Sequence, residues 1–251
     1  MVPRDHGRFA GLTFDDFRRM AGDDTLSPYE KIGFPDEYRA GAEAAIVRDI
    51  AGKLGLERGH GRTVLDIGPG CSELPRMISA LCAGREHRLL LVDSPEMLSQ
   101  LPDEPHVTKL AGRYPDIPEL FVEHRGSVDA VLAYSVVQYV FAEGNIWAFL
   151  DRSLELLAPG GAMLVGDIPN VSKRKRFFAS ATGIAHHKRF TGEDAPPPVD
   201  FNALEPGLID DAAVLGLLAR ARAAGFDAHV LPQAEELPMA NRREDVLIVR
   251  P

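Results

Sequence analysis

The sequence contains a glycine-rich turn and a carboxylate whose spacing suggests that they bind a ligand together. The turn, Gly68-Pro69-Gly70, ends the apolar run VLDIG (64–68), and Asp93 ends the next apolar run, RLLLVD (88–93). Glycine lets the backbone approach a ligand without a clash from a Cβ atom. A carboxylate at the end of the neighbouring strand can accept hydrogen bonds from both hydroxyl groups of a ribose. The pair indicates a site for an adenosine-containing cofactor; the plainer alternatives are an ordinary strand-to-helix turn and a helix cap by Asp93.

The residues after the turn bear on which cofactor binds. A dinucleotide site needs the pattern G-x-G-x-x-G, with a helix N-terminus against the pyrophosphate. Counted from Gly68, the third glycine position holds Glu73. A carboxylate there suits the helix dipole but repels a pyrophosphate. S-adenosylmethionine has a ribose and no phosphate and fits better, so an NAD-dependent oxidoreductase on a related fold is the disfavoured alternative.

The elements that must position these residues alternate along the chain. Five short apolar runs predict strands, at 63–68, 88–93, 107–111, 128–135 and 162–168. Helical patterns lie between most of them, and because parallel neighbours need such crossovers, the alternation predicts a parallel sheet. Two final runs, 226–232 and 245–250, are joined by a polar loop and predict an antiparallel hairpin. We therefore predict an α/β fold, a Rossmann-like, doubly wound, seven-stranded and mostly parallel sheet with an antiparallel C-terminal hairpin.

The sequence divides into an arm, a domain and a long irregular segment within that domain. Residues 1–34 are polar and predict an N-terminal arm or cap, with a short helix near 14–20. Apolar spacing predicts one continuous helix over 35–54, which opens a domain at 35–251. The stretch 169–209 has no regular pattern. Long stretches of this kind often serve as lids or substrate-binding loops, which is the role we expect here.

Several motifs together resemble those of the class I S-adenosylmethionine-dependent methyltransferases, over roughly residues 60–250. The similar segments are a first motif, a second motif, a fourth-strand motif, and a helix, turn and fifth strand: VLDIGPG (64–70), LLLVDS (89–94), DAVLAYSVVQYV (129–140) and LELLAPGGAMLVGD (154–167). The final hairpin also fits this family. The sequence departs from the family at Ser72, where a third glycine is frequent.

The resemblance implies a set of cofactor-binding residues. It places Gly68, Pro69 and Gly70 against the methionyl part of S-adenosylmethionine, and Asp93 on the ribose. It gives Asp66 the roles of holding the loop and reaching the amino group. The other implied positions line the adenine site and the sulfonium end: Ser94, Met97, Gly112, Arg113 and Ser135.

A basic segment suggests how an acceptor could be held. SKRKRFF (172–178) and HHKRF (186–190) together carry six Lys and Arg residues, with no acidic residue between Ser172 and Thr191. We expect an anion-attracting mouth beside the site. We expect Tyr139, Lys173 and Arg176 to contact the acceptor. The alternative is that the basic segment is a solvated helix face.

Four residues are candidates for a general base. His186 and His187 lie in the basic segment, and Asp167 ends the fifth predicted strand. Glu143 is a weaker candidate. Methyl transfer can also proceed without a base, since the sulfonium is already an activated leaving group and alignment of donor and acceptor supplies much of the acceleration.

Composition excludes several classes of protein. The 251 residues contain 28 Lys and Arg and 37 Asp and Glu, a net charge of −9 that disfavours nucleic-acid binding. Tyr134-Ser135-Val136-Val137 also replaces the Asn/Asp-Pro-Pro-Tyr box of enzymes that methylate nucleic-acid amino groups, so an RNA methyltransferase is a disfavoured alternative. Cys71 and Cys82 predict neither a disulfide framework nor a zinc site, and no signal peptide or membrane span is evident. We expect a cytoplasmic protein with no metal, nucleic-acid or membrane partner.

The expected function is S-adenosylmethionine-dependent methyl transfer to a small polar, anionic acceptor. A sugar nucleotide or another phosphorylated metabolite is the expected acceptor, with methylation of oxygen favoured. KIGFPDEYR (31–39), GDIPN (166–170) and KRKRFF (173–178) resemble bacterial enzymes that modify sugars or surface glycans. A noncatalytic sensor or scaffold that binds the cofactor is the alternative. The oligomeric state stays open, with a homo-oligomer among the alternatives.

Overall fold

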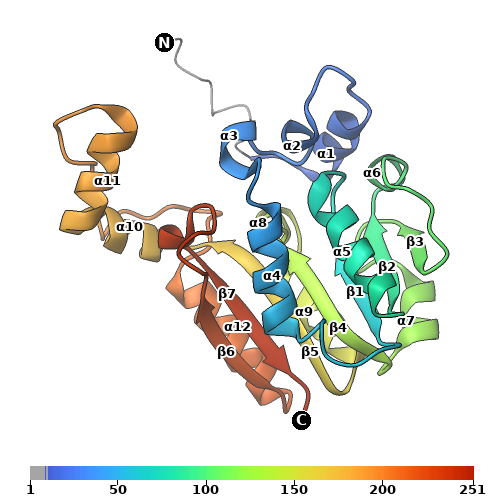
Figure 1. The fold of residues 1–251 in the computed structure, drawn as a ribbon. Helices are drawn as coiled ribbons and strands as arrows, with labels where there is room; N and C mark the ends of the chain where they lie inside the picture. The colour runs from blue at the N-terminus through green and yellow to red at the C-terminus, as the bar shows by residue number, and fades with distance from the viewer. Residues whose placement is uncertain (1–8, 10) are drawn as a thin grey trace.

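A seven-stranded sheet forms the centre of the computed structural model, which describes residue 9 and residues 11–251 (Figure 1). The strands are β1 (Thr63–Ile67), β2 (Arg88–Asp93), β3 (Val107–Ala111), β4 (Val128–Tyr134), β5 (Leu157–Pro169), β6 (Asp227–Pro232) and β7 (Arg243–Val249). Their order is β3-β2-β1-β4-β5-β7-β6, and β7 runs antiparallel to both of its neighbours. The predicted Rossmann-like sheet and C-terminal hairpin are confirmed.

Helices cover both faces of this sheet. They are α4 (Glu43–Leu54), α5 (Glu73–Gly84), α6 (Pro95–Leu98), α7 (Pro118–His124), α8 (Val137–Glu143), α9 (Ile146–Leu156), α12 (Asp211–Ala223) and the short η2 (Ala240–Arg242). Along β1, Leu65 packs in the cluster that includes α9 and α12, whereas Val64 packs in the cluster that includes α4 and α5. Successive side chains of a strand point to opposite faces, so a strand covered on both sides is apolar throughout.

The residues before α4 form three short helices, which we call the cap. They are α1 (Phe14–Ala21), α2 (Pro28–Lys31) and α3 (Asp36–Arg39). Thr13 and Ser27 begin α1 and α2 with capping boxes. The short helix predicted near 14–20 is confirmed by α1, and α2 is a second helix in the arm that was not predicted. The expectation of one helix over 35–54 is wrong, because the chain turns between α3 and α4 at Gly41, whose φ is +85°. Residues 1–8 and 10 of the predicted arm lie outside the described part.

The segment expected to be irregular begins with two helices that project from the body (Figure 1). They are α10 (Val171–Ala179) and α11 (Ala181–Thr191), begun by the side-chain caps Asn170 and Ser180. None of the residues of α10 is buried, so it has no apolar stripe for sequence analysis to detect. The expected lid or substrate-binding role of 169–209 stays a prediction. Within the described residues, the helices lack the length and apolar character that spanning a membrane requires.

Candidate active site

A pocket lies where β1, β2 and β4 end, and the cap forms one of its walls. Most of the residues that the sequence selected line it together: Gly68, Pro69, Gly70, Asp93, Met97, Gly112, Arg113, Ser135 and Tyr139. The cap contributes residues that the sequence did not select: Phe14, Phe17, Ile32, Phe34 and Arg39. Carboxyl ends of adjacent parallel strands are where ligands bind in open α/β sheets, which makes this pocket the candidate active site.

The glycine turn requires glycine at both positions. Gly68 and Gly70 have φ values of +67° and +68°, a left-handed conformation that side chains disfavour. A Cβ atom on Gly68 would lie 2.7 Å from Cγ2 of Val136, and one on Gly70 would lie 2.6 Å from Cγ2 of Ile32. The turn therefore presents bare backbone to the pocket between α8 and the cap.

The Asp93 carboxylate holds this turn against the end of β2. Its Oδ2 accepts a hydrogen bond from the Gly70 amide at 3.0 Å, and its Oδ1 accepts one from the Ser94 amide at 2.7 Å. Burial raises the pKa of Asp93 to about 6, although the two amide bonds act in the opposite direction. Ser94 does not line the pocket; its hydroxyl instead accepts from the Met97 amide and begins α6.

Asp66 is a buried carboxyl behind the turn. It is 3% exposed, and in the described part of the chain no residue donates a hydrogen bond to its side chain. Burial, and then the charge of Asp93, raise the pKa of Asp66 to about 8. Buried carboxyls normally have donors, but Asp66 does not line the pocket, so it is an acceptor available to a water molecule near the turn.

On the other side of the pocket, Ser135 directly follows β4 and lines the pocket, and Asp167 lies behind it near the end of β5. Both residues have strained backbone conformations. Their φ values are +61° and +59°, which is rare for residues with a side chain. The Ser135 hydroxyl donates to Oδ2 of Asp167, and Nη2 of Arg39 donates to Ser135 Oγ and, at 2.6 Å, to the same Asp167 oxygen. Arg243 adds a contact at 2.9 Å from its Nη1 to Asp167 Oδ2. These bonds hold both strained residues in place.

Asp167 and Ser135 were predicted from the sequence, but their partners Arg39 and Arg243 were not. The missing residues come from α3 and β7, far from Asp167 in sequence, so no local spacing connects them. The only available indication was that a buried carboxylate at a strand end needs cationic or amide partners. In the structure Oδ1 of Asp167 also faces the Gln233 amide at 3.4 Å. With these donors around it, Asp167 is placed to position other groups.

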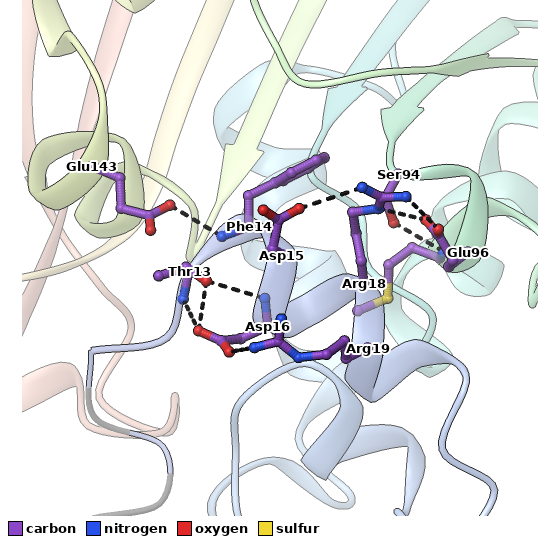
Figure 2. Close-up of polar contacts among 10 residues, drawn as sticks. Thr13, Phe14, Asp15, Asp16, Arg18, Arg19, Ser94, Glu96 and Glu143 are labelled. Carbon is purple, nitrogen blue, oxygen red and sulfur yellow. Dashed lines mark hydrogen bonds and ion pairs between the residues drawn. The ribbon is translucent and has the colours of Figure 1, made fainter.

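Polar contacts attach α1 to the rest of the site (Figure 2). Arg18 donates from Nε and Nη2 to the two Glu96 carboxylate oxygens at 3.0 and 2.7 Å. The Phe14 amide donates to Oε2 of Glu143 at 3.0 Å, and Arg113 lies 3.5 Å from the same oxygen. The Arg18 hydrogen bonds and charge lower the pKa of Glu96 to about 2. The cap is thus anchored at α6 and α8, on opposite sides of the pocket.

The basic segment is not part of this pocket. Lys173 donates to the Arg243 carbonyl, and Arg176 pairs with Asp211. Further along, acidic residues pair with Arg174, Lys175 and Lys188: Glu205 with the first two and Asp194 with the last. Acidic residues that follow the basic run thus pair with most of its cations. The expected anion-attracting mouth stays a prediction, and the residues that line the pocket give it no support. Neither Lys173 nor Arg176 contacts the pocket.

The histidine candidates lie on α11, also outside the pocket. His186 stacks parallel to Phe190 at 6.3 Å and packs edge-on to Phe177 at 5.5 Å. Burial and the nearby Arg242 lower the pKa of His186. Nε2 of His187 lies 3.9 Å from Oε2 of Glu193. In this arrangement neither imidazole reaches the residues that line the pocket.

The sheet order and the antiparallel hairpin define a Rossmann-like methyltransferase fold. No protein-family model and no curated protein matches the sequence. Among solved structures, the N-methyltransferase NodS from Bradyrhizobium japonicum WM9, in complex with S-adenosylhomocysteine, has a TM-score of 0.57 at 15% identity over 95% of this chain and 98% of that one. The plantazolicin methyltransferase BpumL, also with S-adenosylhomocysteine, has a TM-score of 0.57 at 12% identity over 93% and 95%.

A third structural match is longer than this protein. The CurJ carbon methyltransferase has a TM-score of 0.53 at 16% identity and matches 90% of this chain. This chain spans 61% of the length of that one. At these identities the comparisons show the fold, which is shared by enzymes that methylate nitrogen and carbon.

Proposed function

We propose that this protein is an S-adenosylmethionine-dependent methyltransferase that acts on a small molecule. The observation that carries the proposal is that one pocket brings together the glycine turn, Asp93 and Ser135, from the ends of β1, β2 and β4. This combination supplies bare backbone, a carboxylate for a ribose and a polar strand end within one cavity. The shared fold of two structures in complex with S-adenosylhomocysteine supports it.

The residues of the pocket fit such a cofactor. A side chain on Gly68 or Gly70 would fill the place we assign to the methionyl part. Each Asp93 oxygen accepts one amide bond and has a further lone pair for a ribose hydroxyl. Asp66 does not line the pocket, so the role we propose for it is to reach the ammonium group through water. When bound, the cofactor supplies an electrophilic methyl group on a positively charged sulfur.

The chain's own contribution to the reaction is to orient the acceptor and exclude water. Phe17 packs edge-on to Tyr139 with ring centroids 4.8 Å apart, which closes the pocket between the cap and α8. Asp167 already accepts from Ser135 and Arg39, so we assign it a positioning role. We propose that in-line alignment of acceptor and methyl group supplies most of the acceleration.

The finer proposal concerns the acceptor and the cellular location. We propose a small anionic acceptor that is methylated on oxygen, with Tyr139 as one of its contacts. A cation in the pocket wall, Arg39, supports the negative charge. Sugar nucleotides and other phosphorylated metabolites are among the acceptors that we propose to test. We also propose a cytoplasmic location, which is supported by two free, buried thiols, Cys71 and Cys82.

Calorimetric titration with S-adenosylmethionine, S-adenosylhomocysteine and NAD tests the proposal. We expect micromolar binding of the first two and none of NAD. NAD is a necessary control because Glu73, whose charge disfavoured it, is exposed and does not line the pocket. Binding of NAD alone would overturn the proposal. Cofactor binding without release of S-adenosylhomocysteine, across a panel of small carboxylates and sugar nucleotides, would instead favour a noncatalytic sensor.

A further inference from the structure

Arg39 is a buried cation in the wall of the pocket whose hydrogen-bonding capacity is only partly used. Its side chain is 5% exposed and lines the pocket. Nη2 donates to Asp167 and to Ser135, but no residue in the described chain accepts a hydrogen bond from Nε or Nη1. A guanidinium has five N–H donors, and buried donors are nearly always paired. The remaining donors of Arg39 are therefore available to a ligand in the pocket.

Two guanidinium groups meet a single carboxylate beside the pocket. Arg39 and Arg243 share the carboxylate of Asp167, at 2.6 and 2.9 Å. The wider cluster is balanced in charge, because Lys53 lies 2.6 Å from both Asp49 and Asp245. Among the described residues Arg39 therefore has no carboxylate to itself, and an anion in the pocket would form charge-assisted hydrogen bonds with its unused donors.

Aromatic rings fix the plane of the Arg39 guanidinium. Its Cζ lies 4.3 Å from the centroid of the Phe34 ring and 5.4 Å from that of Tyr134, and both rings line the pocket. Arg243 lies 5.7 Å from the same Phe34 ring. Guanidinium held against aromatic faces is preorganised, and its in-plane donors match the two oxygens of a carboxylate. The same rings add apolar surface to the pocket wall.

We propose that Arg39 is the specificity-determining anchor for a carboxylate on the methyl acceptor. The acceptor class is a small molecule with an apolar body and one carboxylate, which the free Nε and Nη1 donors of Arg39 bind. Asp167 is a positioning residue that acts through Arg39 and Ser135. This inference rests on the proposed methyltransferase function for the identity of the ligand as an acceptor, but the binding preference can be tested separately.

Calorimetry with matched probes tests the anchor. The protein, with and without saturating S-adenosylhomocysteine, is titrated with 4-hydroxybenzoate, with the neutral isostere 4-hydroxybenzamide and with the dianion phenyl phosphate. We expect the wild type to bind the benzoate at least about tenfold more tightly than the benzamide, as a charge-assisted pair requires. Arg39→Gln should abolish this preference. Arg220→Gln, which removes an exposed arginine paired with Asp151, is the control for net charge and should retain it.

Each outcome bears on the proposal. Equal binding of benzoate and benzamide by the wild type, absence of binding by either, or a preference that survives in Arg39→Gln would overturn it. Tighter binding of phenyl phosphate than of the benzoate would overturn the carboxylate assignment. The wild-type comparison does not depend on whether Arg39→Gln folds, and Arg39→Lys, which keeps the charge but loses the planar fork, should weaken the preference. Failure to bind S-adenosylhomocysteine with the benzoate preference intact would defeat the proposed function but not the anchor.

Discussion

The two sides of the pocket are built from different kinds of contact. At the ends of β1 and β2 the backbone makes the site: two left-handed glycines expose the chain, and two amides hold Asp93. At the ends of β4 and β5 the side chains make it, since Ser135, Asp167 and Arg39 bond to one another. At the ends of β1 and β2, ligand binding should be lost when side-chain atoms are added to the glycines. At the ends of β4 and β5, stability should be lost when a charge is removed.

The largest expected effect is on stability, on the side-chain side. Asp167→Asn leaves Arg39 and Arg243 buried without their shared carboxylate, so we expect the free energy of unfolding to fall by about 3–5 kcal/mol. Urea denaturation measures it. Asp151→Asn makes the same chemical change in an exposed pair and should cost much less, because water screens that pair. Similar losses in the two variants would show that the buried cluster is no more tightly coupled than a surface contact.

The next effect concerns the backbone side. Gly68→Ala should weaken S-adenosylhomocysteine binding about 100-fold, since its Cβ atom crowds Val136 and enters the pocket wall. Gly160→Ala is the matched control. Gly160 has a similar φ of +74°, but a Cβ atom added there would meet open space, so this variant tests left-handed strain without crowding. If both variants bind the ligand normally, the turn does not contact it.

Asp93 should show a smaller but pH-dependent effect. We expect Asp93→Ala to lower S-adenosylhomocysteine affinity at least about tenfold at pH 7, because the ribose loses its acceptor. Ribose hydroxyls favour the ionised carboxylate, whose pKa is raised to about 6, so wild-type affinity should rise roughly tenfold from pH 5 to pH 7. In Asp93→Asn this rise should disappear. A wild-type rise that the variant keeps would assign it to another group.

The sign of the stability effect is opposite to that of binding. Because the folded protein raises the pKa of Asp93, it favours the protonated form, and the resulting stabilisation is lost as pH rises from about 4 through about 6. Thermal melting of ligand-free wild type and Asp93→Asn over this range checks it. A wild type that gains stability relative to the variant over the same interval would contradict the raised pKa.

The smallest effect should come from the basic segment. Lys173→Glu combined with Arg176→Glu should leave 4-hydroxybenzoate affinity within about twofold of wild type at physiological salt, because both residues lie outside the pocket. Calorimetry at low and high salt measures it. A large, salt-dependent loss would restore the anion-attracting mouth that the sequence predicted.

The backbone side was predictable from sequence, whereas on the side-chain side only Ser135 and Asp167 were predicted and their partner Arg39 was not. Gly68, Gly70 and Asp93 follow strands at fixed positions, so apolar runs and turn residues were enough to place them in one pocket. Arg39 reaches the site only because the chain turns at Gly41, and a continuous helix was predicted there. Long-range pairing between side chains has no period or spacing in the sequence.

The basic segment is a second place where the sequence did not predict the contacts between side chains. Its charge was plain in the sequence, but its partners Glu205 and Asp211 were not, because they follow about 30 residues later. α10 was missed because none of its residues is buried, although Asn170 caps it. Fold elements with an apolar face were predictable; contacts made by exposed charges were not.

The most direct test of the account is a crystal structure with S-adenosylhomocysteine bound. We predict that both ribose hydroxyls lie within hydrogen-bonding distance of the Asp93 carboxylate. The sulfur should face Ser135, with Arg39 bordering the space beyond it. Ligand density away from the turn of Gly68 and Gly70, or a ribose bound elsewhere with Asp93 still holding only its two amides, would contradict the assignment of this pocket.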